Sequence, residues 1–559
     1  MCCARLYYLP VVSLLAVLVA GAVETRAEPP SLRTVIDHQV LAVQGSQSVA
    51  PASASDDYMF ARRVSLDLTG RPISVAALKE FVADSDSAKR ERLIDRLLAS
   101  PEYARHMQYT FDVLLMQRLP KKHIDPAAFA EFLRKSFAEN KPFNQLALEI
   151  LSADGAEETN RSASRFMLDR ELKREETVRV IGRVFLGRDM QCAQCHNHPQ
   201  IDDYYQRHYY GLAAFLKRSY LFTDPKSKQV MIGDKIKGDV TFTSVFTGEE
   251  GKTPPRMLEL TELVDPQPVE EPYEVVPDKT NRGVPKYNRR LQLGPAMVSD
   301  SNRAFRLNIT NRIWAQMMGQ GFVEPLDMFH QENTPSHPQL LETLADALRD
   351  HNYDLKYLLK EIAMSAAYQR ASYWEGEELP PATSYLVGSI KPLSPEQFAW
   401  TLLQSLGEVQ KQRALAIAGF RKADEAFDPQ SNAAQVRIES AVTAALKPTI
   451  DKVVAVFASQ NTASKFDASA NHALFLINGP EIAERLLPGQ GYLIDQLLAC
   501  ETSTEVGDQT YLNVYSRLPT ESERALAVTF IEASPGQKQI AVQELLRTLL
   551  CSAEYRFVR

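Results

Sequence analysis

Residues 190–199, with the sequence MQCAQCHNHP, have the clearest chemical meaning in the chain. Two cysteines separated by two residues and followed directly by histidine are the spacing that attaches a c-type haem. The thiols of Cys192 and Cys195 would form thioether bonds with the haem vinyl groups, and His196 would bind the haem iron as its proximal ligand. We therefore expect c-type haem as the cofactor and electron transfer as the chemistry.

Two other interpretations of this segment stay open. Cys192 and Cys195, with His198 or His196 and a carboxylate such as Asp202 or Asp203 nearby, could bind zinc if a fourth ligand came from elsewhere. Alternatively, the two cysteines form a disulfide that closes a turn, and the histidines are structural. Under that interpretation Cys500 and Cys551 could form a second disulfide.

A cytochrome usually supplies a second iron ligand on the opposite face of the haem. The candidates are the four methionines and one histidine Met190, Met297, Met317, Met318 and His208. Spacing selects none of them, and Met190 is too close in sequence to His196 to reach the opposite face easily.

Other polar residues have less specific patterns. His330, with Asp327 and Glu332, could form an acid/base or metal cluster, although carboxylates near a helix start are ordinary. Arg312 is predicted to be a buried ion-pair partner of Glu324 or Asp327. The sequence has no nucleophile elbow, no glycine-rich phosphate loop and no HExxH motif. A hydrolase would instead need carboxylates that converge in a cleft, and whether the protein is an enzyme stays undecided.

The N-terminus has the pattern of an export signal over residues 1–27. A short positive start is followed by an apolar run, Leu6–Val23, and by Thr25-Arg26-Ala27 as a cleavage-like sequence. The alternative is an uncleaved N-terminal membrane anchor, because an apolar run of this length barely spans a bilayer. We expect an exported protein, periplasmic or extracellular, which is the compartment in which c-type haem is attached.

Charge and hydropathy restrict the partners. The net charge is −7, from 63 Lys and Arg against 70 Asp and Glu, so the chain has no electrostatic footprint for nucleic acid. No later segment is apolar and long enough to span a membrane once the signal is removed. The expected partner is a redox protein or a cell-surface protein, and its identity is unknown.

Hydrophobic periodicity predicts a mainly α fold. Residues 88–100, 177–190 and 354–362 have apolar side chains at helical spacing, whereas 228–232 and 240–247 alternate like strands. We predict a cytochrome-like helical domain at 35–217, a small β-containing insertion with a proline-rich linker at 218–300, and a second helical domain at 301–559.

A short pattern occurs three times. A leucine-rich helix is followed by serine and, three residues later, tyrosine, in residues 100–103, 365–368 and 552–555. We expect the serine to end one helix and the tyrosine to pack back on it, a structural role.

Several longer motifs resemble a family of exported planctomycete proteins with two domains. Its first domain is a cytochrome-like domain of unknown function, and its second is a planctomycete-specific domain of unknown function. The resemblance to the first rests on RRVSLDLTGRP (62–72), LIDRLLASPEY (93–103), NKPF (140–143) and CAQCHNHP (192–199). The resemblance to the second rests on NRIW (311–314), GQGFVEP (319–325), PSHP (335–338), LSPEQ (393–397) and LFLIN (474–478).

The resemblance implies a cytochrome-like protein but no assigned reaction. Members commonly have an aromatic Trp-x-x-His-Trp-type segment after the first tyrosine motif, whereas residues 106–111 here are HMQYTF and lack the tryptophans. If that segment lines a cofactor pocket, the pocket is altered in this chain. The alternative function is a non-redox scaffold or binding module of an exported carbohydrate-degrading or cell-surface system, with a structural metal or a disulfide at the CxxCH segment.

Overall fold

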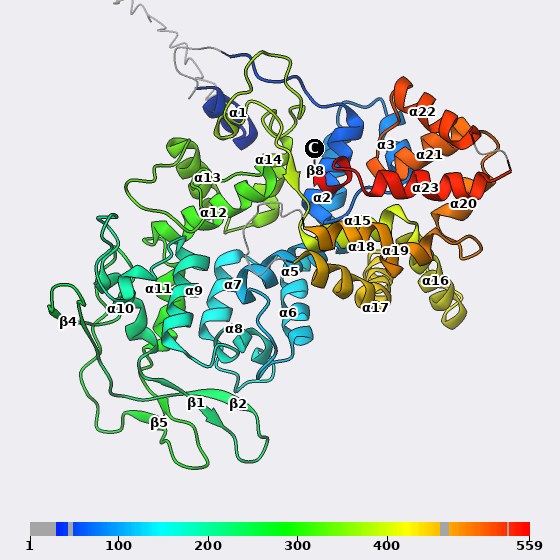
Figure 1. Ribbon diagram of the computed structural model, residues 1–559. Coiled ribbons are helices and arrows are strands. Elements are labelled where there is room, and N and C mark those ends of the chain that lie inside the picture. The colour runs from blue at the N-terminus through cyan, green and yellow to red at the C-terminus, as the bar shows by residue number, and fades with distance from the viewer. Residues whose placement is uncertain (1–29, 43–48, 459–468, 534–535, 559) are drawn as a thin grey trace, which may run out of the picture. The chain divides into compact units, whose positions relative to one another are not determined.

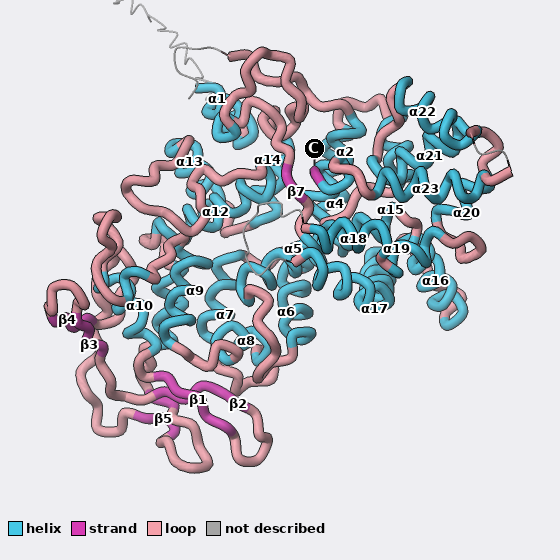
Figure 2. Tube along the Cα trace, viewed as in Figure 1, coloured by secondary structure: helices cyan, strands magenta, loops and turns pink. Residues whose placement is uncertain are grey.

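The computed structural model describes residues 30–42, 49–458, 469–533 and 536–558 (Figure 1). The predicted signal peptide and the alternative membrane anchor, both within residues 1–27, lie outside the described residues. Among the helices that are described, none has the length and apolarity to cross a membrane. The prediction of a mainly α fold is confirmed, because helices dominate and the strands form only two-stranded hairpins and pairs (Figure 2).

The N-terminal part is a series of helices whose apolar faces pack together. Their starts follow local sequence signals: side chains of Asp56, Ser74, Ser100 and Asp125 each accept a hydrogen bond from the first turn of the next helix. The helices are α1 (Leu32–Ala42), α2 (Asp57–Thr69), α3 (Val75–Ala83), α4 (Lys89–Ala99), α5 (Pro101–Met116), α6 (Pro126–Ala138), α7 (Phe143–Ser152), α8 (Arg165–Leu168), α9 (Arg174–Leu186) and α10 (Gln206–Leu216).

Three antiparallel hairpins follow α10. They pair β1 (Ser219–Thr223) with β2 (Val230–Asp234), β3 (Val240–Thr243) with β4 (Glu250–Thr253), and β5 (Tyr273–Val275) with β6 (Val284–Pro285). The predicted strand at 240–247 ends early, because the chain turns at Ser244, whose carbonyl accepts from the backbone N–H of Gly248 at 2.9 Å. The strand at 228–232 is confirmed with a shift to 230–234.

The remainder is again helical. It contains α11 (Leu293–Val298), α12 (Arg303–Met318), α13 (Pro338–Asp350), α14 (Leu355–Met364), α15 (Pro395–Ser405), α16 (Glu408–Ala423), α17 (Asn432–Phe457), α18 (Ala470–Asn478), α19 (Pro480–Ala483), α20 (Leu493–Ala499), α21 (Ser503–Tyr515), α22 (Glu521–Glu532) and α23 (Lys538–Leu550). A short antiparallel pair joins β7 (Lys391–Pro392) to β8 (Phe557–Val558).

Buried apolar side chains form two clusters within the single compact unit that begins at Leu32. The first cluster extends from Leu32 to Tyr385 and includes Leu512, so it contains residues on both sides of position 300. The second extends from Phe398 to Tyr555. The predicted domain boundaries at 217 and 300 do not coincide with a break between these clusters and stay predictions. The first cluster gives way to the second between Tyr385 and Phe398.

The repeated serine–tyrosine pattern forms helix ends, as expected. Each serine N–H donates to a carbonyl in the last turn of the preceding helix. Each serine hydroxyl accepts a hydrogen bond from the backbone N–H of the tyrosine three residues later. The pairs are Ser100 with Tyr103, Ser365 with Tyr368 and Ser552 with Tyr555. All three tyrosine side chains are buried. The pattern therefore folds a helix back onto the next segment and belongs to the core.

Candidate functional site

A tight turn after α9 positions the CxxCH segment. The helix ends at Gly187, whose φ of 65° is in the left-handed region, and Arg188 N–H donates to the carbonyl of Gly182 at 3.0 Å. A Cβ at Gly182 would lie 2.7 Å from the Arg188 carbonyl oxygen, so glycine is needed for this close approach. The turn leads the chain directly to the cysteines.

A turn of 3₁₀ helix, Cys192–Gln194, begins at the first cysteine, and Cys195 follows it directly. The backbone N–H groups of Cys195 and His196 both donate to the carbonyl of Cys192, at 3.2 and 3.4 Å. Cys192 and Cys195 are exposed free thiols, and Cys500 and Cys551 are half-buried free thiols. Both thiols of the motif are therefore accessible to a reactive ligand. Among the described residues, neither the Cys192–Cys195 nor the Cys500–Cys551 disulfide is formed.

The His196 ring is held in one tautomer. Its Nδ1 lies 2.6 Å from the carbonyl oxygen of Asn197, and because a carbonyl can only accept, Nδ1 carries the proton. In the neutral ring Nε2 therefore has a free lone pair, which is the arrangement of histidines that bind a metal through Nε2. Phe246 packs on the ring with its centroid 4.3 Å away, and Val245 N–H donates to the carbonyl of Cys195 at 3.0 Å.

The side chains of Val245 and Phe246 lie at the tip of the β3–β4 hairpin and are largely exposed, Phe246 by 73%. The alternating pattern of residues 240–247 predicts a strand through these two residues and not a hairpin tip. The sequence signal for a turn at this place is Gly248, which follows the apolar pair Val245-Phe246 and Thr247.

His198 has the opposite tautomer. Its Nδ1 accepts from the backbone N–H groups of Gln200 and Ile201, at 3.2 and 3.0 Å, so the proton of the neutral ring is on Nε2. Burial lowers the pKa of His198, with His196 adding to the effect. In this conformation His198 closes a loop and has no free ring nitrogen for a metal. Within the described ranges, no group of three or more His, Cys, Asp or Glu side chains is placed to hold a metal ion.

All five candidates for the second iron ligand are buried. Met190, Met297, Met317 and Met318 belong to the first apolar cluster, and the Cε atom of Met190 packs against Gly182. His208 is also buried, on α10. None of these side chains is exposed beside the two accessible thiols.

His208 predicts a pH dependence of stability. Burial first, and then the charges of Arg188, Arg207 and Arg256, lower its pKa to about 4, below the ordinary value of 6.5. As the pH falls from 6.5 to 4, His208 binds a proton in the unfolded chain but stays neutral in the folded chain. The free energy of unfolding that is present above pH 6.5 is therefore lost over this range. Between pH 7 and 4.5 the free energy of unfolding, measured with urea, should fall in both proteins. We expect the fall in His208→Gln to be smaller than in the wild type by about 2–3 kcal/mol. Equal losses would contradict this assignment.

The segment around His330 does not form the predicted cluster with Asp327. Arg183 Nε donates to the carboxylate of Asp327 at 2.5 Å, while the His330 ring meets Tyr204 edge-on with centroids 6.0 Å apart. The Tyr204 hydroxyl donates to the Phe329 carbonyl at 3.0 Å. These contacts tie the 327–330 segment to α9 through Arg183 and, through Tyr204, to the loop that follows the CxxCH motif.

The predicted ion pair of Arg312 is wrong. Its guanidinium donates to Oδ1 of Asn308 at 3.0 Å and to the carbonyl of Arg183 at 2.7 Å. Glu324 instead accepts from the N–H of Gly321 at 2.8 Å. Burial lowers the pKa of Arg312 to about 10, because no carboxylate is bonded to this guanidinium.

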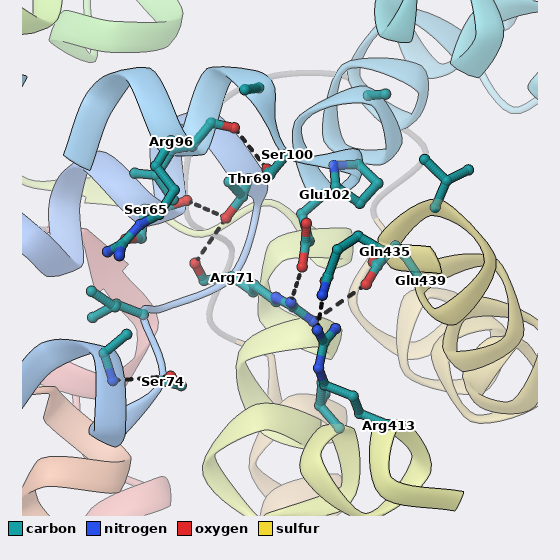
Figure 3. A pocket seen from close by; sticks show the side chains of 18 of the residues that line it. Ser65, Thr69, Arg71, Ser74, Arg96, Ser100, Glu102, Arg413, Gln435 and Glu439 are labelled. Carbon is teal, nitrogen blue, oxygen red and sulfur yellow. Dashed lines mark hydrogen bonds and ion pairs between the residues drawn. The ribbon is translucent and has the colours of Figure 1, made fainter. Parts of the chain in front are cut away.

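A cavity of about 1080 Å³ lies between α2, α4 and α5 on one side and α16 and α17 on the other. Figure 3 shows the Arg71 guanidinium between the carboxylates of Glu102 and Glu439, at 2.5 and 3.8 Å. Burial raises the pKa of Glu102, but Arg71 and Arg105 outweigh burial and leave that pKa below its ordinary value. These two carboxylates are partners of the arginines beside them, Glu102 with Arg71 and Glu439 with Arg71 and Arg105.

Comparison with known families agrees with the predicted domain order. Residues 35–220 match the family model PSCyt2, described as a protein of unknown function (DUF1549). Residues 289–531 match the family model PSD1, described as a protein of unknown function (DUF1553). No curated protein and no solved structure matches the chain.

Proposed function

We propose that this chain, which belongs to the family in which a PSCyt2 domain precedes a PSD1 domain, is an exported protein that binds a c-type haem and transfers electrons outside the cytoplasm. Cys192 and Cys195 would hold the haem covalently, and His196 would be the proximal iron ligand. The family names include a cytochrome-like label but assign no function, so the proposal rests on the geometry of the CxxCH segment.

The observation that carries the proposal is the tautomer of His196. Nδ1–H donates to the Asn197 carbonyl and leaves Nε2 free, beside two exposed free thiols one turn apart. A hydrogen bond of this kind fixes the ring orientation and raises the basicity of the other nitrogen toward a metal. His198 is unsuitable, because Nδ1 is occupied by two backbone donors. Because no group of three His, Cys, Asp or Glu side chains converges in the described part of the chain, the donor set fits haem better than zinc.

The surrounding residues have distinct roles in this proposal. The Asn197 carbonyl holds the proton on Nδ1, Phe246 limits rotation of the imidazole, and the bond from Val245 to Cys195 ties the hairpin tip to the motif. When bound, the haem supplies one-electron redox chemistry. With Met190 and the other candidates packed in the core, we propose that the described core supplies no methionine ligand to the iron.

The test is a pyridine haemochrome assay on the full chain, expressed with its own N-terminal segment in a host with active c-type haem maturation. We expect a c-type absorption spectrum at stoichiometric haem content. The variant Cys192→Ser/Cys195→Ser should be colourless, because no thiol of the CxxCH motif remains to form a thioether. The matched control Cys500→Ser/Cys551→Ser also removes two thiols and should stay coloured.

A colourless wild-type protein would refute the haem proposal. Metal analysis and thiol counting on that protein would then distinguish the two alternatives at Cys192 and Cys195. Bound zinc would favour the metal site, and the absence of both zinc and free thiols at these positions would favour the disulfide.

A further inference from the structure

A second cavity, of about 710 Å³, lies where α5 meets α12, α15 and the end of α17. Its apolar lining includes aromatic and aliphatic side chains from all four helices: Tyr109, Phe111, Leu114, Ile313, Phe398 and Phe457. The size is within the range of small-molecule sites, which are commonly 300–1,000 Å³ and mostly apolar. Residues 106–111, which depart from the family pattern, supply part of the wall.

Among the buried side chains of this lining, His106 alone has a polar atom without a hydrogen-bond partner, while the half-buried His472 also has one, at Nδ1. His106 is buried, its Nδ1–H is bonded to the backbone carbonyl of Asp67, and its Nε2 has no hydrogen-bond partner. The ring is tightly held on the Nδ1 side, where a Cβ at Gly70 would lie 2.6 Å from Nδ1. Burial lowers the pKa of His106 to about 3, so the ring is neutral and Nε2 is an acceptor.

Charged groups in the same lining are already bonded. Lys391 Nζ donates to Oδ1 of Asp67 at 2.5 Å and to the carbonyls of Gln316 and Met317, both at 2.8 Å. Arg118 pairs with Glu396 at 2.7 Å. A buried acceptor without a donor is costly, so Nε2 of His106 favours a ligand that brings a donor into the cavity.

We propose that this cavity binds a flat aromatic molecule with a hydroxyl group, whose O–H donates to Nε2 of His106 while its ring contacts the apolar walls. The aromatic lining favours a planar ring, which it can contact edge-on or face-on. The buried acceptor of His106 suits one hydroxyl, whereas a metal ion would need further ligands, and within the described residues no such group of His, Cys, Asp or Glu exists. This inference uses neither the CxxCH segment nor the proposed haem.

The test compares 2-naphthol with naphthalene on the full chain, by isothermal titration. The two probes share the same rings and differ in the hydroxyl, so their ratio of affinities isolates the hydrogen bond. We expect 2-naphthol to bind at least roughly 10-fold more tightly, because a site with an orphaned acceptor discriminates against the analogue that leaves it unpaired. Equal affinities, or no binding of either probe, would overturn the proposal.

Two substitutions at His106 form a matched pair. His106→Asn places an amide N–H near the position of Nδ1 and keeps a donor for Asp67, but it removes the acceptor at Nε2. His106→Gln places an amide oxygen near the position of Nε2 and restores an acceptor. The preference for 2-naphthol should be lost in the first variant and kept in the second, and a preference retained in His106→Asn would also overturn the proposal. If the asparagine variant does not fold, the ¹⁵N shift of Nε2 in histidine-labelled wild type must change with 2-naphthol and stay unchanged with naphthalene.

Discussion

Replacing Glu439 with alanine is expected to lower the free energy of unfolding by about 3–5 kcal/mol, because it leaves a buried arginine without its anion. The side chains of Arg105 and Glu439 are only 2% and 4% exposed, and Arg105 Nη1 donates to the Glu439 carboxylate. The Arg105 guanidinium also lies over the ring of Trp400, 3.6 Å from its centroid. Burial lowers the pKa of Arg105, and the charge of Glu439 opposes this effect. The variant lacks that carboxylate, so the buried guanidinium loses the anion bonded to it.

The pair connects α5 of the first apolar cluster with α17 of the second, so its loss should also weaken the packing between them. The matched control is Glu131→Ala, which removes an exposed glutamate paired with Arg134 on α6. An exposed pair contributes about 0–1 kcal/mol, so the control should unfold almost like the wild type. Urea unfolding followed by circular dichroism measures both. A loss in Glu439→Ala no larger than in the control would show that the buried pair is not a main connection.

Replacing His196 with glycine is expected to remove the proximal iron ligand, whereas replacing His198 with alanine should leave iron ligation intact. The two histidines are two residues apart and differ in which ring nitrogen carries the proton, Nδ1 in His196 and Nε2 in neutral His198. The visible spectrum of His196→Gly should lose the histidine-ligated form, and added imidazole should restore it by taking the place of the missing side chain. His198→Ala should keep the wild-type spectrum.

His198→Ala has its own expected effect, which is structural. The backbone N–H groups of Gln200 and Ile201 lose their acceptor, with a cost of about 1–3 kcal/mol if water does not replace it. A changed spectrum in His198→Ala together with an unchanged spectrum in His196→Gly would reverse the roles that the structure assigns. If His196→Gly is purified without haem while His198→Ala is coloured, the assignment to His196 stands.

Local patterns in the sequence predicted much of the fold. Helix type follows from apolar periodicity, and helix ends follow from short-range signals such as Ser100, whose hydroxyl accepts from Tyr103 N–H at 3.3 Å. The CxxCH spacing also placed two thiols on one turn, which the backbone bonds from Cys195 and His196 to Cys192 bear out. These features depend on residues a few positions apart.

Contacts between distant segments could not be predicted in this way. Arg105 and Glu439 are 334 positions apart, and neither residue type nor spacing selects one as the partner of the other. For the same reason the sequence suggests a nearby carboxylate as the partner of Arg312, whereas the guanidinium bonds to Asn308 and to the backbone of Arg183. The ring of Phe246 over His196 depends on how the β3–β4 hairpin folds back, which no local pattern fixes.

The most direct test of the central claim is the intact mass of the purified wild-type protein under denaturing conditions, after export from a host that attaches c-type haem. Thioether bonds survive denaturation, so the account predicts a mass increased by one haem and lost in Cys192→Ser/Cys195→Ser. A wild-type mass equal to that of the unmodified chain would contradict the account, and the free thiols of Cys192 and Cys195 would then need another explanation.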